Sequence, residues 1–175
     1  MNIGISGAQS TGKTTLVDDL ERMDFKVFKL VARTVMKDHP INKDGTDDTQ
    51  RAIIKTHLKN LEDARGVSFM DRCLVDGLVF TLYGARHGKV SAECLVEVLT
   101  DFYNNIRRYD YIVYLKPEFN IVADGVRDTD LEFRDELCEL YEMVLSNIKV
   151  PIITPSGTPS ERIQTILLAT GLFED

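Results

Sequence analysis

Four fixed positions near the amino terminus are suited to binding a chain of phosphates. Gly7, Gly12, Lys13 and Thr14 match the pattern G-x-x-x-x-G-K-[ST]. Glycines let the backbone turn tightly, so that successive N–H groups point inward around an anion. The lysine can then reach the β- and γ-phosphates, and the threonine hydroxyl can ligate Mg²⁺. A glycine-rich turn without a ligand is the alternative. The residues predicted to bind a nucleoside triphosphate are Gly7, Ala8, Gln9, Ser10, Thr11, Gly12, Lys13, Thr14 and Thr15.

A carboxylate follows the third apolar run of the chain. Asp71 comes directly after residues 66–70, which have the pattern of a buried strand. At the tip of such a strand, a carboxylate can orient a Mg²⁺-bound water or accept the proton of an attacking hydroxyl. Arg72 is predicted to hold the acceptor or its phosphate. Helix N-capping is the alternative for Asp71. Asp76 is predicted either to contact the acceptor or to have a capping or solvated role.

Several arginines are candidates for contact with a negatively charged transition state. Arg127 and Arg134 belong to the polar residues 117–134, which resemble a lid. An arginine from the same chain stabilises the charge that phosphoryl transfer spreads over the equatorial oxygens. The alternative is a surface network of ion pairs with the acidic residues at 128, 130, 132 and 135. Arg33 follows the second apolar run and is a candidate contact to the acceptor.

The elements that must position these residues alternate between strand and helix. Apolar runs predict strands at residues 2–6, 25–30, 66–70, 111–115 and 150–153. Helical patterns lie at residues 16–22, 31–37, 49–65, 74–87, 91–107, 131–148 and 160–169. This alternation predicts an α/β fold, with a parallel sheet of about five strands covered by helices on both faces. Ligands bind at the carboxyl ends of such strands, where the candidate residues fall.

Length and composition fit one domain that spans residues 1–175. Residues 38–48 are so polar that they are predicted to form a mobile surface loop. The formal net charge of −7 argues against broad nonspecific binding to nucleic acid or anionic lipid. No apolar run approaches the roughly 20 residues that span a bilayer. We therefore expect a cytoplasmic protein that does not bind membranes.

The cysteines and histidines have no spacing typical of a metal site. Cys73, Cys94 and Cys138 lie far apart and are expected to be reduced structural thiols. The three histidines are expected at surface or helix positions and not in a catalytic or metal-binding role. They are His39, His57 and His87.

Other segments narrow the class of nucleotide-binding protein. A GTPase needs N-K-x-D after a late strand, whereas residues 42–45 read N-K-D-G, with the aspartate one position too early. The S-G-G-Q signature of transporter ATPases is absent from the sequence. A small chain with an Asp-Arg pair and a late arginine-bearing segment fits a kinase that acts on a small acceptor.

Four stretches together resemble a known kinase family. They are ISGAQSTGKTTL, FMDRCLVDGLVF, YDYIVYLKPEFNIVADGVRDTDLEFR and VPIITPSGTPSERI. The chain is similar to the P-loop kinases that include the ribosylnicotinamide kinase domain of the bacterial NAD regulator. That family also includes phage kinases acting on 5-hydroxymethyluracil in DNA, and thymidylate and deoxynucleoside kinases are more distantly similar. The resemblance implies the three-layer P-loop NTPase fold.

The resemblance also implies roles for individual residues. Lys13 and Thr14 would hold phosphates and Mg²⁺, Asp71 would act as base or metal-water ligand, and Arg127 would be the lid arginine. In related kinases, the segment equivalent to Gly157 and Pro159 runs beside the adenine, and Arg162 follows that segment. Relatives often carry a glutamate three residues before the arginine that follows the second strand. Leu30 stands there in this chain, which leaves the identity of the acceptor open.

We therefore expect a kinase that uses ATP and Mg²⁺ to phosphorylate a hydroxyl of a nucleoside- or nucleotide-like acceptor. One alternative is a phage-type kinase, in the host cytoplasm, that phosphorylates 5-hydroxymethyluracil within DNA. The basic stripe of Arg51, Lys55 and Lys59 favours that alternative, and the acidic net charge disfavours it. A nucleotide-dependent switch with little turnover is the other alternative. A homodimer is also left open.

Overall fold

The computed structural model describes residues 1–29, 39–117 and 128–173. Its centre is a parallel sheet of five strands in the order β2-β3-β1-β4-β5. The strands are β1 (Asn2–Ser6), β2 (Lys26–Phe28), β3 (Ser68–Asp71), β4 (Tyr111–Tyr114) and β5 (Ile152–Ile153). The prediction of a five-stranded parallel sheet is confirmed.

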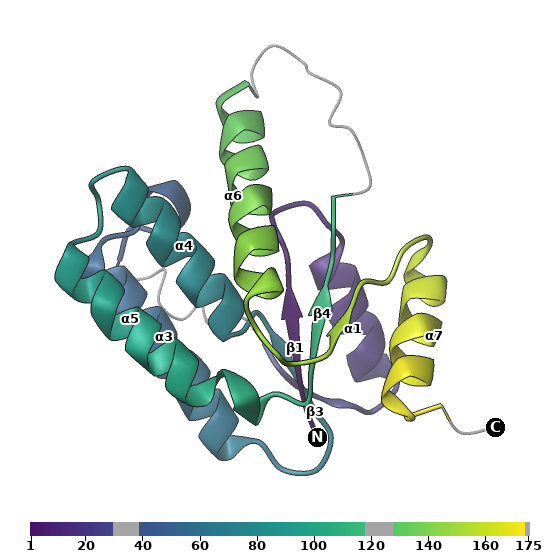
Figure 1. Cartoon of the computed structure of the whole chain (residues 1–175). Coiled ribbons are helices and arrows are strands. Elements are labelled where there is room, and N and C mark those ends of the chain that lie inside the picture. Colours follow the sequence, from purple (N-terminus) through teal and green to yellow (C-terminus); the bar gives the residue numbers. More distant parts are fainter. Residues whose placement is uncertain (30–38, 118–127, 174–175) are drawn as a thin grey trace.

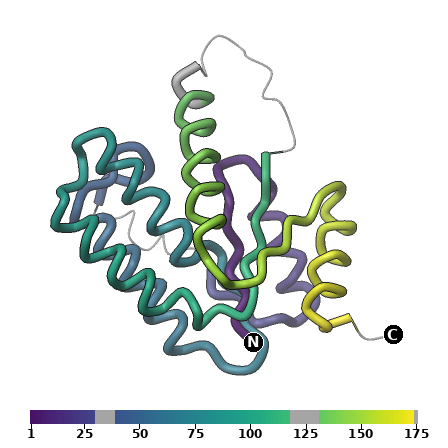
Figure 2. The backbone as a smooth tube through the Cα atoms, viewed as in Figure 1, coloured from purple at the N-terminus to yellow at the C-terminus, as the bar shows by residue number. Residues whose placement is uncertain are grey.

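Helices cover both faces of this sheet, as the alternation of strand and helix predicts (Figures 1 and 2). One face carries α1 (Lys13–Arg22) and α7 (Pro159–Thr170). The other carries α3 (Asp47–Asp63), α4 (Leu74–Arg86), α5 (Ala92–Asn105) and α6 (Asp128–Ser146). Two short 3₁₀ turns, η1 (Asn42–Asp44) and η2 (Ile106–Arg108), complete the described elements. The α/β fold with three layers is therefore confirmed.

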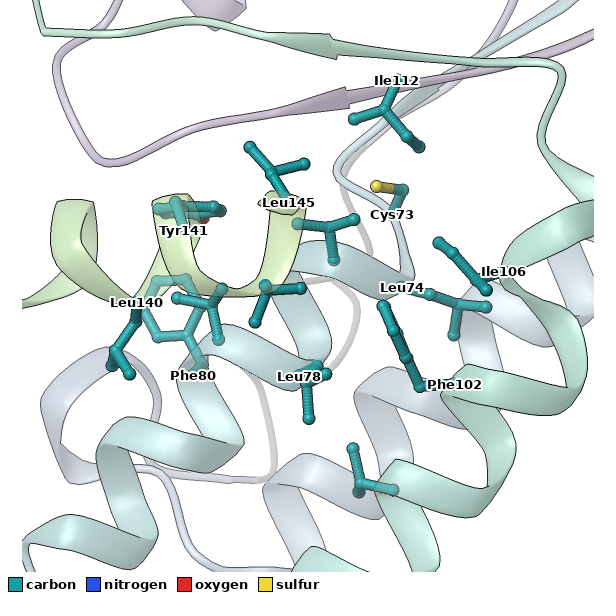
Figure 3. Close-up of a cluster of buried hydrophobic side chains, with 14 of the residues drawn as sticks. Cys73, Leu74, Leu78, Phe80, Phe102, Ile106, Ile112, Leu140, Tyr141 and Leu145 are labelled. Atoms are coloured by element: carbon teal, nitrogen blue, oxygen red, sulfur yellow. The ribbon is translucent and has the colours of Figure 1, made fainter. Parts of the chain in front are cut away.

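Side chains of the central strand alternate between two cores. Ile3 and Ile5 of β1 are fully buried with α1 and α7. Gly4 faces the opposite way, where a Cβ would lie 2.8 Å from the Cβ of Cys73. Figure 3 shows this second core between the sheet, α4 and α6, with Leu74, Leu78, Ile112, Leu140, Tyr141 and Leu145 among its labelled side chains. Packing on both faces fixes the central strand and the loop that follows it.

The register of the sheet brings the candidate residues to one edge. β1 lies between β3 and β4, and Ile5 is level with Asp71, while Ser6 is level with Tyr114. Because all strands are parallel, the loop after β1 and the carboxylate after β3 emerge side by side. α6 extends beyond this carboxyl edge of the sheet (Figure 1).

Most described residues of the predicted surface loop at residues 38–48 are exposed, but the segment is not too polar to pack. Residues 42–44 form η1, which packs against α4. Thr49 donates a hydrogen bond to the carbonyl oxygen of Pro40 at 2.7 Å, and Lys89 reaches the carbonyl of Lys43 at 2.7 Å. These long-range contacts satisfy polar groups that we expected to face water. The predicted helix at residues 31–37 lies outside the described residues.

Among the described helices, none combines the length and the apolar composition needed to cross a membrane.

Candidate active site

Residues 7–12 turn tightly between β1 and α1. The φ angles of Gly7, Ser10 and Gly12 are +148°, +61° and +87°, a region that favours glycine. A Cβ on Gly7 would lie 2.5 Å from the carbonyl oxygen of Leu115, so a larger residue does not fit. Gly12 is the N-cap of α1, and the positive end of the helix dipole faces the loop. The exposed residues among 7–15 are Gln9, Ser10, Gly12, Thr14 and Thr15, whereas Gly7, Ala8, Thr11 and Lys13 are buried.

Lys13 lies folded back onto the loop that precedes it. Its Nζ donates hydrogen bonds to the carbonyl oxygen of Gly7 at 2.6 Å, to that of Ala8, and to Thr11 Oγ1 at 3.2 Å. Burial, with a contribution from the Arg72 guanidinium, lowers the pKa of Lys13 to about 7. A bound triphosphate would favour the charged ammonium, because opposite charge raises the pKa of a lysine.

The loop is anchored to the far end of the chain by Arg162. Its guanidinium donates hydrogen bonds to the carbonyl oxygens of Thr11, at 2.7 Å, and Gly157, at 3.0 Å. A cleft beside this contact has an empty volume of about 980 Å³. It is lined by Thr11, Gly12, Thr15, Leu16, Gly157, Thr158, Pro159, Glu161 and Arg162. The predicted adenine-contacting residues Gly157 and Pro159 therefore lie next to the phosphate loop.

Asp71 and Arg72 turn the chain from β3 into α4 beside the phosphate loop. Asp71 is buried at the strand tip, with 4% of its surface exposed. Arg72 has a φ angle of +70°, an uncommon conformation for a residue with a side chain. The N-cap of α4 is Cys73, so the N-capping alternative for Asp71 is wrong.

We call the space between these residues and the loop the phosphate pocket. It has an empty volume of about 770 Å³. It is lined by Gln9, Ser10, Thr11, Gly12, Lys13, Thr14, Asp71 and Arg72. The hydroxyl of Thr14 and the carboxylate of Asp71 are hard oxygen ligands of the kind that Mg²⁺ prefers. The residues present therefore fit the magnesium ion that the sequence predicts.

Asp76 lies at the centre of a buried hydrogen-bond network. Its Oδ2 accepts from the Ser6 hydroxyl at 2.5 Å and the Cys73 backbone N–H at 3.0 Å. Its Oδ1 accepts from Arg72 at 3.1 Å and the Tyr141 hydroxyl at 2.7 Å. The capping role predicted as one alternative for Asp76 is confirmed, since the Cys73 N–H is the N-cap donor of α4. The solvated alternative is wrong, because only 2% of Asp76 is exposed.

Neighbouring charges and hydrogen-bond donors favour the ionised form of the Asp76 carboxylate. Burial alone would raise its pKa, but the positive charges of Arg72 and Lys13 and two hydroxyl donors outweigh burial. The pKa of Asp76 therefore lies below its usual value.

Replacement of Asp76 by asparagine should cost stability in a pH-dependent way. Removing one partner of a buried ion pair costs about 3 kcal/mol at neutral pH. Because the folded-state pKa is lowered, the carboxylate's contribution is complete above about pH 4 and is lost as the pH falls through the folded pKa. Urea unfolding between pH 7 and about pH 2 should show the wild type and Asp76→Asn converging in acid. A difference that stays constant with pH would contradict this account.

A second pocket lies between η1, α3 and α4, and we call it the helix pocket. Its empty volume, which includes space open to solvent, is about 420 Å³. It is lined by Ile41, Asn42, Gln50, Ile53, His57, Arg72, Asp76, Gly77 and Phe80. Arg72 lines both this pocket and the phosphate pocket. The two pockets are therefore neighbours that share Arg72.

His57, expected at a surface or helix position, lies on α3 and lines the helix pocket. Only 1% of it is exposed, and its Nε2 has no hydrogen-bond partner among the described residues. The signal in the sequence was its position seven residues after Gln50, two turns along the same face of α3. That spacing alone does not distinguish a core position from a pocket.

The predicted arginines are only partly described. Arg33 and Arg127 lie outside the described residues. Arg134 lies seven residues before Tyr141 on α6, and therefore on the same face of that helix. Tyr141 donates a hydrogen bond to the carbonyl oxygen of Gly7 at 3.2 Å, so this face points toward the phosphate loop. Arg134 is also within 3.9 Å of Asp135, the ion pair predicted as its alternative role.

The family follows from a comparison of the whole sequence with known families. The model described as "AAA domain" matches residues 2–162, which include the phosphate loop, Asp71 and Arg162. The chain belongs to this AAA domain family. No curated protein matches the chain.

Solved structures with the same fold as this AAA domain chain include several kinases. The NadR protein in complex with NR has a TM-score of 0.73 at 19% identity, over 99% of this chain and 52% of that one. The present chain thus spans about half the length of that NadR chain. Deoxyadenosine kinase from M. mycoides, with products dCMP and dCDP bound, has a TM-score of 0.69 at 20% identity. This match covers 99% of the present chain and 100% of the kinase chain. YorR protein from Bacillus subtilis, in complex with phosphorylated GDP, has a TM-score of 0.61 at 16% identity. This match covers 98% of the present chain and 96% of the YorR chain. The similarity to NadR-like and deoxynucleoside kinases is confirmed at the level of the fold.

Proposed function

We propose that residues 1–175 form one kinase domain that transfers the γ-phosphate of ATP to a hydroxyl of a nucleoside-like acceptor. One observation carries the proposal: Arg72 lines both the phosphate pocket and the helix pocket. A triphosphate on the loop and an acceptor in the helix pocket would meet at Arg72. Holding two reactants in contact lowers the barrier to their reaction.

The described residues supply the groups that this reaction needs. The backbone N–H groups of the loop and Lys13 would bind the β- and γ-phosphates. Asp71 would accept the proton of the acceptor hydroxyl or orient a metal-bound water. Thr14 and Asp71 would hold Mg²⁺, which neutralises charge on the phosphates when it is bound. The acceptor oxygen forms a bond to the γ-phosphorus, the bond to the β-phosphate oxygen breaks, and ADP leaves.

Outside the described residues, Arg127 and Arg33 keep their proposed roles. Arg127 would stabilise the charge on the transferring group as a lid arginine, with Arg134 on the inward face of α6 as a second candidate. Arg33 would contact the acceptor. Gly157 and Pro159 would border the adenine.

A base within DNA has less support as the acceptor. The basic stripe that favours it is partly neutralised, because Arg51 Nε lies 2.7 Å from Glu97 Oε2. Arg51 also lies 3.9 Å from the carboxylate of Asp47. Phosphate contacts that depend on this arginine would first have to break the pair with Glu97.

The proposal is tested by a transfer screen with γ-labelled ATP and Mg²⁺. The acceptors are nucleosides, nucleoside monophosphates, ribosylnicotinamide and DNA that contains 5-hydroxymethyluracil. We expect label on at least one small nucleoside-like acceptor. Label on DNA alone, with a steep fall in rate as salt rises, would support the phage-type alternative. Stoichiometric nucleotide binding with no product on any acceptor would support a switch and overturn the proposal.

A further inference from the structure

We propose that the outer face of α5 binds a second copy of this chain, with the two α5 helices antiparallel around a two-fold axis. The inference goes beyond the proposed kinase function and does not depend on it, because α5 lines neither the phosphate pocket nor the helix pocket. It follows from an exposed apolar stripe on this helix and from the order of the charges beside that stripe.

One side of α5 is buried, and the other presents apolar side chains to solvent. Phe102 and the following Ile106 point into the core (Figure 3), where α5 packs against α3 and α4. On the outer side, Val96 and Tyr103 are 62% and 57% exposed. Among the described helices, α5 alone carries two large exposed hydrophobic side chains. The Tyr103 ring is also held in place, because it lies edge-on to the Phe102 ring with 5.2 Å between the centroids.

The exposed apolar residues have the spacing of a seam between two helices. We call Ala92, Val96, Leu99 and Tyr103 the α5 stripe, in which the intervals are four, three and four residues. At 3.6 residues per turn, these positions fall within about 60° of one another around the helix. Such intervals are typical of helices that pair along one apolar seam. The α5 stripe is therefore suited to packing against another helix.

The charges beside the α5 stripe indicate that this other helix is α5 of a second copy. Glu93, Thr100 and Arg107 follow one side of the stripe at seven-residue intervals, and all three are exposed. Within the described part of the chain, Glu93 and Arg107 form no ion pair, whereas the neighbouring Glu97 pairs with Arg51. An antiparallel copy centred on Thr100 places each Glu93 opposite Arg107 of the partner subunit. A parallel copy would place like charges opposite each other, which is unfavourable.

The same antiparallel arrangement buries the α5 stripe of both copies. With Thr100 at the two-fold axis, Tyr103 packs against the segment between Val96 and Leu99 of the partner subunit. Each copy supplies the same residues, so the contact closes as a dimer and does not propagate into a filament. Removal of apolar surface from water on both copies is the driving force.

Analytical ultracentrifugation of the whole chain measures the dimer directly and needs no kinase activity. We expect wild type to have twice the mass of one chain at about 100 μM protein. Val96→Glu should weaken the dimer at least about 10-fold, because it places a charge in the apolar seam. The matched control is Leu168→Glu on α7, where the leucine is 58% exposed, and this variant should dimerise like wild type. If circular dichroism shows that Val96→Glu is unfolded, Tyr103→Ser replaces it with the same expected loss.

Oxidative cross-linking tests the orientation of the two helices. Thr100→Cys should form a disulfide between copies, because the two cysteines would meet at the axis. Glu93→Cys should not form one, whereas a parallel pair would cross-link at both positions. Wild type, in which Cys138 is the most exposed thiol, gives the background.

Charge reversal separates pairing between copies from an effect within one helix, since Glu93 and Arg107 also complement the dipole of α5. Glu93→Arg and Arg107→Glu should each weaken the dimer about 10-fold, because each places like charges opposite each other. The double variant should restore the wild-type dissociation constant, although its charges oppose the dipole. A role in the dipole alone would leave the dimer unchanged in all three variants.

Any of four results would overturn the inference. They are a monomeric wild type at the stated concentration, an undiminished dimer in the folded Val96→Glu or Tyr103→Ser variant, no cross-link through Thr100→Cys, and a double reversal no tighter than the single ones. None of these results bears on phosphate transfer. The kinase proposal and this one can therefore fail separately.

Discussion

Lys13→Ala should reduce phosphate transfer by on the order of 10³-fold, because it removes a charge that stabilises the transition state. Lys13 is the buried cation of the phosphate loop, and its ammonium lies within hydrogen-bonding distance of Gly7 and Thr11. When a triphosphate replaces these partners, the charge acts where water is scarce and electrostatic interactions are strong. The measurement is the rate of transfer from γ-labelled ATP to the best acceptor of the screen.

Lys149→Ala is a suitable control for this prediction. Lys149 is an exposed lysine between α6 and β5, away from the loop. It should keep full transfer activity. Circular dichroism and thermal unfolding would establish that Lys13→Ala remains folded. Undiminished transfer by a folded Lys13→Ala protein would refute both the role of the loop and the kinase proposal.

Asp71→Asn should lower turnover by about 10²- to 10⁴-fold, the range typical of general acid–base groups. The dissociation constant for ATP should change little, because Asp71 is proposed to act on the acceptor proton or on metal-bound water. Asparagine keeps the size of the side chain and removes its negative charge, so the tip of β3 should keep its packing. Steady-state kinetics and titration with a non-hydrolysable ATP analogue measure the two quantities separately.

The matched control is Asp63→Asn, at the exposed end of α3. It should affect neither turnover nor nucleotide affinity. If Asp71→Asn instead lost ATP binding and turnover together, Asp71 would belong to the nucleotide site. The proposed role on the acceptor side would then be rejected.

The fold and the phosphate pocket were predictable because their signals are local in sequence. An apolar strand, a glycine pattern and a helix occur in sequence around Gly7 and Gly12, and backbone geometry fixes what they form. Asp71 was predictable because a parallel sheet collects the carboxyl ends of its strands at one edge. A strand followed by a charged residue is sufficient to suggest such a position.

The helix pocket could not be predicted because it depends on contacts between distant segments. The segment that contains Asn42 was expected to be mobile, yet it packs against α4 and forms one wall. His57 had no distinguishing spacing, and its unpaired nitrogen is visible only once α3 and α4 are packed together. The network around Asp76 likewise joins β1, α4 and α6, which no pattern within one helix reveals.

The anchoring of the phosphate loop by Arg162 has a consequence for local unfolding. The carbonyl oxygen of Thr11 accepts a hydrogen bond from a guanidinium 151 positions later in the chain. Whenever α7 detaches from the sheet, the loop loses this support for its backbone. Loosening of α7 would therefore disturb the phosphate loop even while the central strands stay folded.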